Sequence, residues 1–253
     1  MKKAVFILTI SAILMIACGS KQQHDMHTEA EAISLFQNEP GDSALYGLAC
    51  DGCTDSVLVF LPYAGGDPDT FDIIDAFQHR RIFGQPHIGD ELVVILNPED
   101  SAEAYMVFNT EELKGTWCYM VSPTLRNVEK MPRRMQRRMM ERMPDSIKQQ
   151  LLVPREYSLR LKRDNTVQVR GMQRRQTTTD DMSPVEYPAA KRYTEWHLYN
   201  GKLILKADTI AGFSQEGAKP ETDTVEIEML FRDSLVLRFP DHTQSYYRKK
   251  DEN

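Results

Sequence analysis

The chain has 253 residues, of which 27% are charged, and a formal net charge of −6 at pH 7. An acidic balance of this size gives no overall attraction for nucleic acid or anionic lipid, so we expect no nucleic-acid partner. The length exceeds what one small barrel needs and is sufficient for two compact domains.

An export signal is predicted at the start of the chain. Lys2 and Lys3 precede an apolar run at 4–16, which is too short to span a membrane after processing. Small residues then lead into Cys18 at the expected cleavage position. This arrangement resembles the lipobox of bacterial lipoproteins, which implies that residues 1–17 are removed and that Cys18 carries acyl chains such as palmitate. An ordinary signal peptide and an uncleaved anchor are the alternatives.

Cleavage there would remove two lysines and no acidic residue, so the charge would become −6 − 2 = −8 over 253 − 17 = 236 residues. Membrane attachment would then depend on the acyl chains alone, and we expect an exported lipoprotein of the outer membrane or cell envelope. Residues 18–37 are polar and predict a flexible tether. The tether holds His24, Met26 and His27, but a flexible two-histidine segment is a poor copper or zinc site, so we expect no metal.

A small all-β domain is predicted over 38–112, either a partly open barrel or a sandwich. Its runs of Val, Ile, Leu, Phe and Tyr alternate with turn sequences such as Asp51-Gly52 and Asn97-Pro98. The polar stretch Asn109 to Leu113 marks the boundary with the next domain. The five expected strands are 45–49, 55–61, 70–75, 91–96 and 104–108.

Cys50 and Cys53 are separated by Asp-Gly, which favours a tight turn that a disulfide would join in an oxidising compartment. Free or metal-binding thiols and a redox dithiol are the alternatives. Redox sites of the thioredoxin type place the first cysteine at a helix N-terminus, whereas this pair is followed by the strand-like run 54–60. We therefore interpret the pair as a candidate structural disulfide.

A second domain is predicted over 113–250 as an eight-stranded antiparallel barrel. Hairpin turns at 164–165, 200–201, 232–233 and 241–242 join neighbouring runs, and Asn200-Gly201 favours a type I′ turn. Successive hairpins predict an up-and-down meander. The eight expected strands are 116–121, 157–161, 166–172, 194–199, 202–207, 222–231, 234–239 and 243–248.

Apolar and polar residues alternate along three of these runs, which predicts one buried face on each. Glu226 and Glu228 are expected to lie on the exposed face as cross-strand partners of Arg238. The residues expected on the buried face are Val167, Val169, Gly171, Val225, Ile227, Met229, Phe231, Leu235, Leu237 and Phe239.

The first and last of the eight runs carry a family resemblance. Gly115-Thr116-Trp117 on the first and Arg248 on the last resemble the lipocalin pattern, and the resemblance covers 113–250. Lipocalin-like domains of secreted lipoproteins from Bacteroidetes-type bacteria are more similar still. The resemblance implies that Trp117 closes one end of the barrel, that Arg248 packs across it, and that the barrel carries a small hydrophobic ligand.

A basic, methionine-rich insertion at 127–152 follows the first strand of the predicted barrel. Met135, Met139 and Met143 are spaced four residues apart and predict one stripe of a helix that starts at Pro132. Pro144 should end that helix, and Asp145-Ser146 should cap a second one that runs through Leu152. We interpret Met135, Met139, Met143 and Arg138 as a lid over the barrel or a partner surface.

No catalytic set stands out in the sequence, and we expect no cofactor. Tyr193, Glu195, His197 and Tyr199 alternate along one strand, so Glu195 and His197 are either an acid/base pair or part of an outward face. The preferred function is a non-catalytic binding or interaction lipoprotein, attached to the membrane and contacting a small hydrophobic ligand or an envelope protein. The alternative is an envelope enzyme or thiol-redox factor that uses Cys50 and Cys53 or the Glu195/His197 face.

Overall fold

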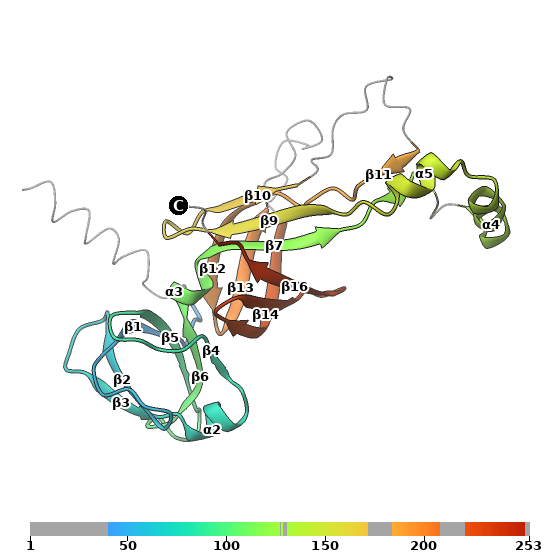
Figure 1. The fold of residues 1–253 in the computed structure, drawn as a ribbon. Helices are drawn as coiled ribbons and strands as arrows, with labels where there is room; N and C mark the ends of the chain where they lie inside the picture. The colour runs from blue at the N-terminus through green and yellow to red at the C-terminus, as the bar shows by residue number, and fades with distance from the viewer. Residues whose placement is uncertain (1–39, 127, 129–130, 172–183, 208–220, 251–253) are drawn as a thin grey trace, which may run out of the picture. The chain divides into compact units, whose positions relative to one another are not determined.

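The computed structural model describes residues 40–126, 128, 131–171, 184–207 and 221–250 (Figure 1). The predicted signal at 1–17 and the predicted tether at 18–37, with Cys18, lie outside the described residues. No helix in the described part is long and apolar enough to cross a membrane.

Six strands form the first sheet, in the order β3-β2-β1-β5-β6-β4. All neighbours are antiparallel except β4 and β6, which are parallel. A bridge between Asp72 and Glu103 joins β3 to the start of β6, so the sheet curls into a partly open barrel rather than a sandwich. The strands are β1 (Leu45–Ala49), β2 (Val57–Pro62), β3 (Asp69–Asp72), β4 (Ile82–Phe83), β5 (Glu91–Leu96) and β6 (Ala104–Asn109).

Two short helices in this region were not predicted. The strand expected at 70–75 ends at Asp72, whose side chain accepts a hydrogen bond of 2.8 Å from the backbone of Ile74, the first residue of helix α2 (Ile74–Gln78). The expected polar boundary contains helix α3 (Thr110–Leu113), which Asn109 caps by accepting from the backbone N–H groups of the next two glutamates. The division into domains near residue 112 stays a prediction.

Eight antiparallel strands form the second sheet, a nearly closed barrel with the order β10-β9-β7-β16-β15-β14-β13-β12. The first and last strands are neighbours, as a closing meander requires, and Arg248 lies opposite Trp117. The strands are β7 (Gly115–Val121), β9 (Arg155–Leu161), β10 (Val167–Arg170), β12 (Tyr193–Tyr199), β13 (Lys202–Ala207), β14 (Glu221–Phe231), β15 (Ser234–Arg238) and β16 (Thr243–Arg248).

The two outermost strands of this sheet, β10 and β12, approach each other without forming a full ladder. An isolated bridge joins Thr166 to Glu195, and the backbone N–H of Trp196 donates to the carbonyl of Asn165 at 2.8 Å. The predicted hairpin at Asn200-Gly201 has positive φ angles of 47° and 75°, the conformation that a type I′ turn requires. Local turn chemistry therefore fixes the strand neighbours, and the side-chain alternation fixes the inner face.

The alternation along β14 is broken by a bulge, which corrects one prediction. Val225 and Ile227 are buried as expected, but the register shifts between Ile227 and Met229. Beyond the shift Leu230 is buried, while Met229 and Phe231 are exposed. A bulge inserts one extra residue, so every later side chain moves to the opposite face. Gly171 is also exposed, against the prediction.

The insertion contains two helices, α4 (Arg133–Glu141) and α5 (Asp145–Gln150), between β8 (Thr124–Leu125) and β9. Pro132 and Pro144 occupy the positions before the two helices, so Pro144 does separate them. The predicted capping by Asp145 and Ser146 is wrong, because no side chain caps α5 and both residues lie inside it. β8 forms a separate two-stranded sheet with β11 (Val185–Glu186).

Candidate functional site

The structure brings together the three residues that the lipocalin resemblance assigns to barrel closure, Gly115, Trp117 and Arg248. Trp117 is fully buried, and its indole N–H donates to the carbonyl of Leu113 at 2.8 Å. The guanidinium carbon of Arg248 lies 4.2 Å from the centre of the Trp117 ring. The cation therefore stacks on the aromatic face and covers it from the outside.

Backbone carbonyls hold the Arg248 guanidinium in this position. Its Nη1 donates to Lys114 at 2.9 Å, its Nε donates to Arg232 at 2.5 Å, and its Nη2 donates to Glu112. Gly115 has a φ of +139°, and a Cβ placed there would lie 2.5 Å from Nη1. Glycine is required because the guanidinium passes directly over this backbone position.

The interior next to Trp117 is filled by apolar side chains. Leu161, Leu203, Leu205, Leu235 and Leu237 are at most 1% exposed and belong to the same buried cluster as Trp117. A core packed in this way holds no ligand, so a binding site inside the barrel has to lie farther along the strands.

Farther along the same inward faces, four tyrosines form what we call the tyrosine layer: Tyr119, Tyr157, Tyr193 and Tyr246. Tyr119 and Tyr157 lie opposite each other on β7 and β9, with ring centres 5.7 Å apart. Tyr246 on β16 lies 5.1 Å from Tyr119, and both pairs meet edge to face. Tyr193 on β12 packs against the same core.

Two of the four hydroxyls are held by hydrogen bonds. Tyr157 donates to the carbonyl of Pro188 at 2.7 Å, and Tyr193 donates to the carboxylate of Asp223 at 2.6 Å. Lys191 binds both oxygens of Asp223 at 2.8 Å. The hydroxyls of Tyr119 and Tyr246 make no hydrogen bond to another residue within the described part of the chain.

Burial keeps three of these four phenols neutral. It raises the pKa of Tyr119 and Tyr246, and it raises the pKa of Tyr193 together with the hydrogen bond to Asp223. A phenol whose pKa is raised does not serve as a base near neutral pH but can donate a hydrogen bond. The layer therefore offers aromatic walls and hydrogen-bond donors, which suit binding rather than proton abstraction.

Sequence reasoning missed this layer. It noted Tyr193 only as a member of an alternating set with Glu195, but a bulge between the two residues separates them. Glu195 is exposed and pairs with Lys206 at 3.3 Å, while Trp196 and Leu198 face the core. One signal in the sequence could have indicated the layer. Tyr119 lies two residues beyond Trp117, so alternation along the strand places both side chains on the same face.

Cys50 and Cys53 lie in the turn between β1 and β2 rather than at a helix N-terminus. The Cys53 sulfur lies 3.2 Å from the carbonyl oxygen of Cys50, to which its thiol donates. This position lacks the helix dipole that lowers a thiol pKa in thioredoxin-type sites. The disulfide stays a prediction. The described residues contain no group of three or more His, Cys, Asp or Glu side chains arranged to hold a metal ion.

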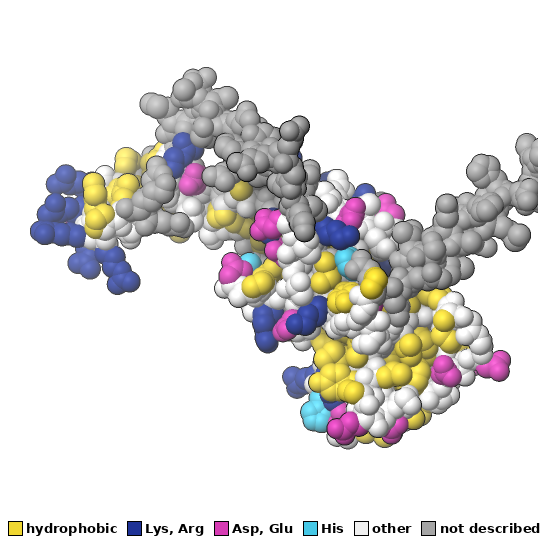
Figure 2. All heavy atoms as spheres, turned by 180° about the vertical axis from the view of Figure 1, so that it is seen from behind, with side chains coloured by type: hydrophobic (Ala, Val, Ile, Leu, Met, Phe, Trp, Pro, Cys, Tyr) yellow, Lys and Arg dark blue, Asp and Glu magenta, His cyan; other side chains and the backbone are white. Residues whose placement is uncertain are grey.

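The methionines of the insertion do not share one environment. Met135 is 58% exposed, Met139 is half-buried and Met143 is buried. Neither α4 nor α5 has a buried residue. Figure 2 shows basic side chains in dark blue beside hydrophobic ones in yellow on this insertion. Arg138 lies on the same exposed helix, and the role as a lid or partner surface stays a prediction.

Comparison with known proteins agrees with the geometry of the barrel. Residues 165–250 match the model of a family described as lipocalin-like. This match supports a lipocalin-like domain. The matched segment runs from the turn before β10 through β16 and so includes Arg248 but not Trp117. No curated protein and no solved structure matches the chain. A lipocalin-like barrel suggests a ligand-binding module.

Proposed function

We propose that this protein is a cell-envelope lipoprotein whose barrel binds a small hydrophobic ligand without catalysing a reaction. The observation that carries the proposal is the tyrosine layer, which lies inside the barrel, two residues farther along β7 than the buried Trp117. Aromatic walls bury apolar surface, and the hydroxyls of Tyr119 and Tyr246 provide the small number of directed polar groups that ligand sites use.

The ligand class follows from the charge and protonation of the layer. Its phenols are neutral donors, and Asp223 is already satisfied by Lys191 and Tyr193. A ligand that fits would carry an apolar body and an uncharged hydrogen-bond acceptor, such as a carbonyl or ether oxygen. A ligand with its own carboxylate would meet no unpaired cation in this layer.

The test of ligand binding compares three versions of the full-length protein isolated from the cells that make it. Native mass spectrometry should detect a retained small molecule in the wild type. We expect the fraction of protein that retains the molecule to be about ten-fold lower in the double variant Tyr119→Phe with Tyr246→Phe, because the variant lacks two hydroxyl donors but keeps the aromatic surface. Tyr247→Phe is the matched control, since Tyr247 is exposed and bonds Glu156 on the outer face. A clean mass for the wild type would contradict carriage.

Membrane attachment has a separate test. Cys18→Ser removes the thiol that acylation needs, so we expect the protein to move from the membrane fraction to the soluble fraction. Unchanged fractionation of Cys18→Ser would contradict lipidation without affecting the barrel.

The thiol-redox alternative is tested by counting reactive thiols at Cys50 and Cys53 before and after mild reduction. A non-catalytic protein should show no pair that is both easily reduced and reactive near neutral pH. A pair of that kind would favour the redox factor over the binding module.

A further inference from the structure

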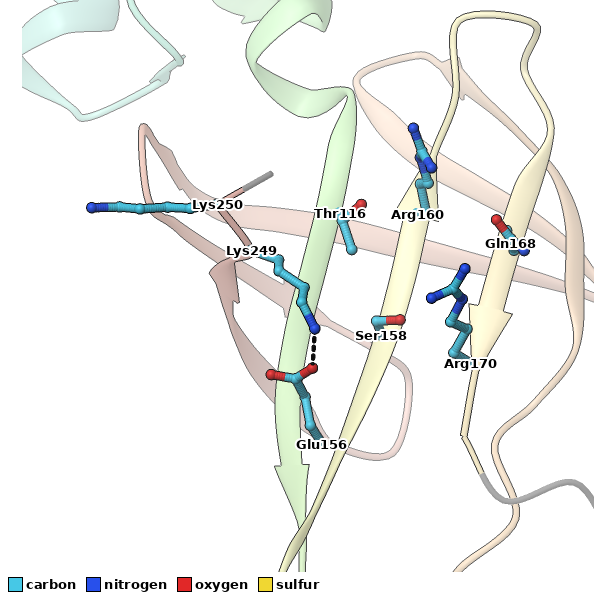
Figure 3. Close-up of a pocket in the computed structure, with 8 residues that line it drawn as sticks. All are labelled: Thr116, Glu156, Ser158, Arg160, Gln168, Arg170, Lys249 and Lys250. Carbon is cyan, nitrogen blue, oxygen red and sulfur yellow. Dashed lines mark hydrogen bonds and ion pairs between the residues drawn. The ribbon is translucent and has the colours of Figure 1, made fainter. Parts of the chain in front are cut away.

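A hollow of about 370 Å³ lies on the outer face of the barrel, over β7, β9 and β10 and the residues that follow β16. Figure 3 shows its lining side chains rising from the outward faces of these strands. The register places Gln168 opposite Arg160, and Arg170 opposite Ser158, on β10 and β9. The hollow is separate from the tyrosine layer, because successive side chains of a strand point to opposite faces.

The lining of this hollow is strongly basic although the whole chain is acidic. Its eight residues include Arg160, Arg170, Lys249 and Lys250 but only one acid, Glu156, so their formal charge is 4 − 1 = +3. The whole chain has a formal charge of −6. Lys250 extends away from the other lining side chains, so the centre of the hollow lies nearer the two arginines (Figure 3).

The single carboxylate of the hollow, Glu156, already has two hydrogen-bond donors. Glu156 accepts from Lys249 at 2.7 Å and from the Tyr247 hydroxyl at 2.7 Å. These two hydrogen bonds lower the pKa of Glu156, so it stays ionised and paired with Lys249. Arg160 and Arg170 form no ion pair with any other residue that the structure describes.

By contrast, basic side chains on the outer faces of β13 and β15 form ion pairs with neighbouring strands. Lys202 pairs with Glu226 at 3.2 Å, Lys206 pairs with Glu195 at 3.3 Å, and Arg238 contacts two glutamates. Cross-strand pairs of opposite charge are favourable, whereas like charges on neighbouring strands repel. Arg160 and Arg170 lie at diagonal positions of β9 and β10 without such a partner among the described residues, so an anion between them would relieve their mutual repulsion.

We propose that this outer hollow binds a phosphate group, with Arg160 and Arg170 as the two anion-binding side chains. Arginine presents parallel N–H donors that match phosphate oxygens, and two such side chains can share one phosphate. Thr116, Ser158 and Gln168 add uncharged hydrogen-bonding groups around them. The volume exceeds that of a single phosphate, so the ligand is a phosphorylated small molecule or a lipid headgroup.

The test uses full-length protein in an uncharged detergent and phosphate-free buffer at low salt. Inorganic pyrophosphate is titrated calorimetrically into the wild type and into the double variant Arg160→Gln with Arg170→Gln. We expect saturable binding that weakens by at least about ten-fold in the double variant, because two charge-assisted contacts are lost. At the same concentration, pyrophosphate should also raise the melting temperature of the wild type more than that of the double variant.

Arg238→Gln is the matched control, since it removes a strand cation from the outer surface of the same barrel outside the hollow. Its affinity should stay within about two-fold of wild type, because long-range charge effects are screened by salt. Equal loss in Arg238→Gln would overturn the proposal in favour of a general charge effect. Absence of saturable binding to both pyrophosphate and the lipid probe described next would also overturn it.

A second arm replaces pyrophosphate with water-soluble dihexanoyl phosphatidic acid, which presents the same group on a lipid. Tighter binding of this lipid than of pyrophosphate would assign the hollow to a membrane headgroup, and the reverse order would assign it to a soluble phosphate. Both orders support the phosphate site. Neither result depends on the ligand of the tyrosine layer, because the two sites lie on opposite faces of the strands.

Discussion

The two ends of the barrel interior use the same strand faces for different purposes. At the Trp117 end, the indole is fully buried and the Arg248 guanidinium donates to three backbone carbonyls. At the tyrosine layer, two residues farther along β7, the Tyr119 hydroxyl has no hydrogen bond to another described residue. Satisfied polar atoms and close packing stabilise a fold, whereas a donor left available inside a barrel suits a ligand.

The largest effect should come from removing the closing indole. We expect Trp117→Ala to lower the free energy of unfolding by about 3–5 kcal/mol, because it leaves a cavity under Arg248 and removes the bond to Leu113. Urea denaturation followed by circular dichroism measures the change. A loss below about 1 kcal/mol would show that this end does not hold the barrel together.

A smaller loss is expected from one added methyl group at the same end. Gly115→Ala places a Cβ against Nη1 of Arg248 at a φ of +139°, so we expect a cost of about 1–3 kcal/mol from overpacking and backbone strain. The matched control is Gly65→Ala, which also has a positive φ but no atom within 4 Å of the added Cβ. A larger cost in Gly65→Ala would mean that backbone strain, and not the guanidinium, sets the effect.

High pH should lower the free energy of unfolding through the tyrosine layer, because its buried phenols can ionise. Burial raises the pKa of Tyr246 above the ordinary value of 10.0. Above pH 10 this tyrosine therefore ionises in the unfolded chain before it ionises in the folded protein. The contribution of Tyr246 to the free energy of unfolding is complete below pH 10 and is lost as the pH rises above that value. The slope is at most about 1.4 kcal/mol per pH unit for one tyrosine. Urea midpoints between about pH 9 and pH 11 measure it. The slope should be shallower in Tyr246→Phe, and an unchanged slope would contradict this assignment.

The smallest effect should come from a hydroxyl of the layer itself. We expect Tyr246→Phe to change the free energy of unfolding near neutral pH by less than about 1 kcal/mol, because the aromatic surface remains and no hydrogen bond to a described residue is lost. Thermal denaturation beside Trp117→Ala gives the comparison directly. A destabilisation as large as that of Trp117→Ala would assign the layer a structural role.

Most of the barrel was predictable because its signals are local. Lys202–Ala207 and Thr243–Arg248 have the bounds expected from side-chain alternation and turn residues. The bulges on β12 and β14 were not predictable, because an extra residue in a ladder depends on the partner strand. Met229 and Phe231 were assigned to the wrong face for that reason.

The candidate sites were less predictable than the strands. Trp117 and Arg248 are separated by more than a hundred positions, and only the family pattern linked them before the structure placed them opposite each other. The tyrosine layer and the diagonal placement of Arg160 and Arg170 depend on which strands are neighbours. Tyrosine and arginine are common in strands, so only the neighbouring strands show that these particular side chains form a candidate site.

The sequence alone determined most of the β-strands, the hairpins that join the barrel strands and the inner face of most strands, since period-two alternation and turn residues act over a few positions. It did not predict the two-residue strands β4, β8 and β11. The tertiary structure decided where the tyrosines gather and which cations lack an ion-pair partner among the residues that it describes. The first depends on the antiparallel pairing of β7 with β9 and β16, and the second depends on the pairing of β9 with β10. Tyr119 is therefore part of a layer because of its neighbours on β9 and β16, not because of its own segment.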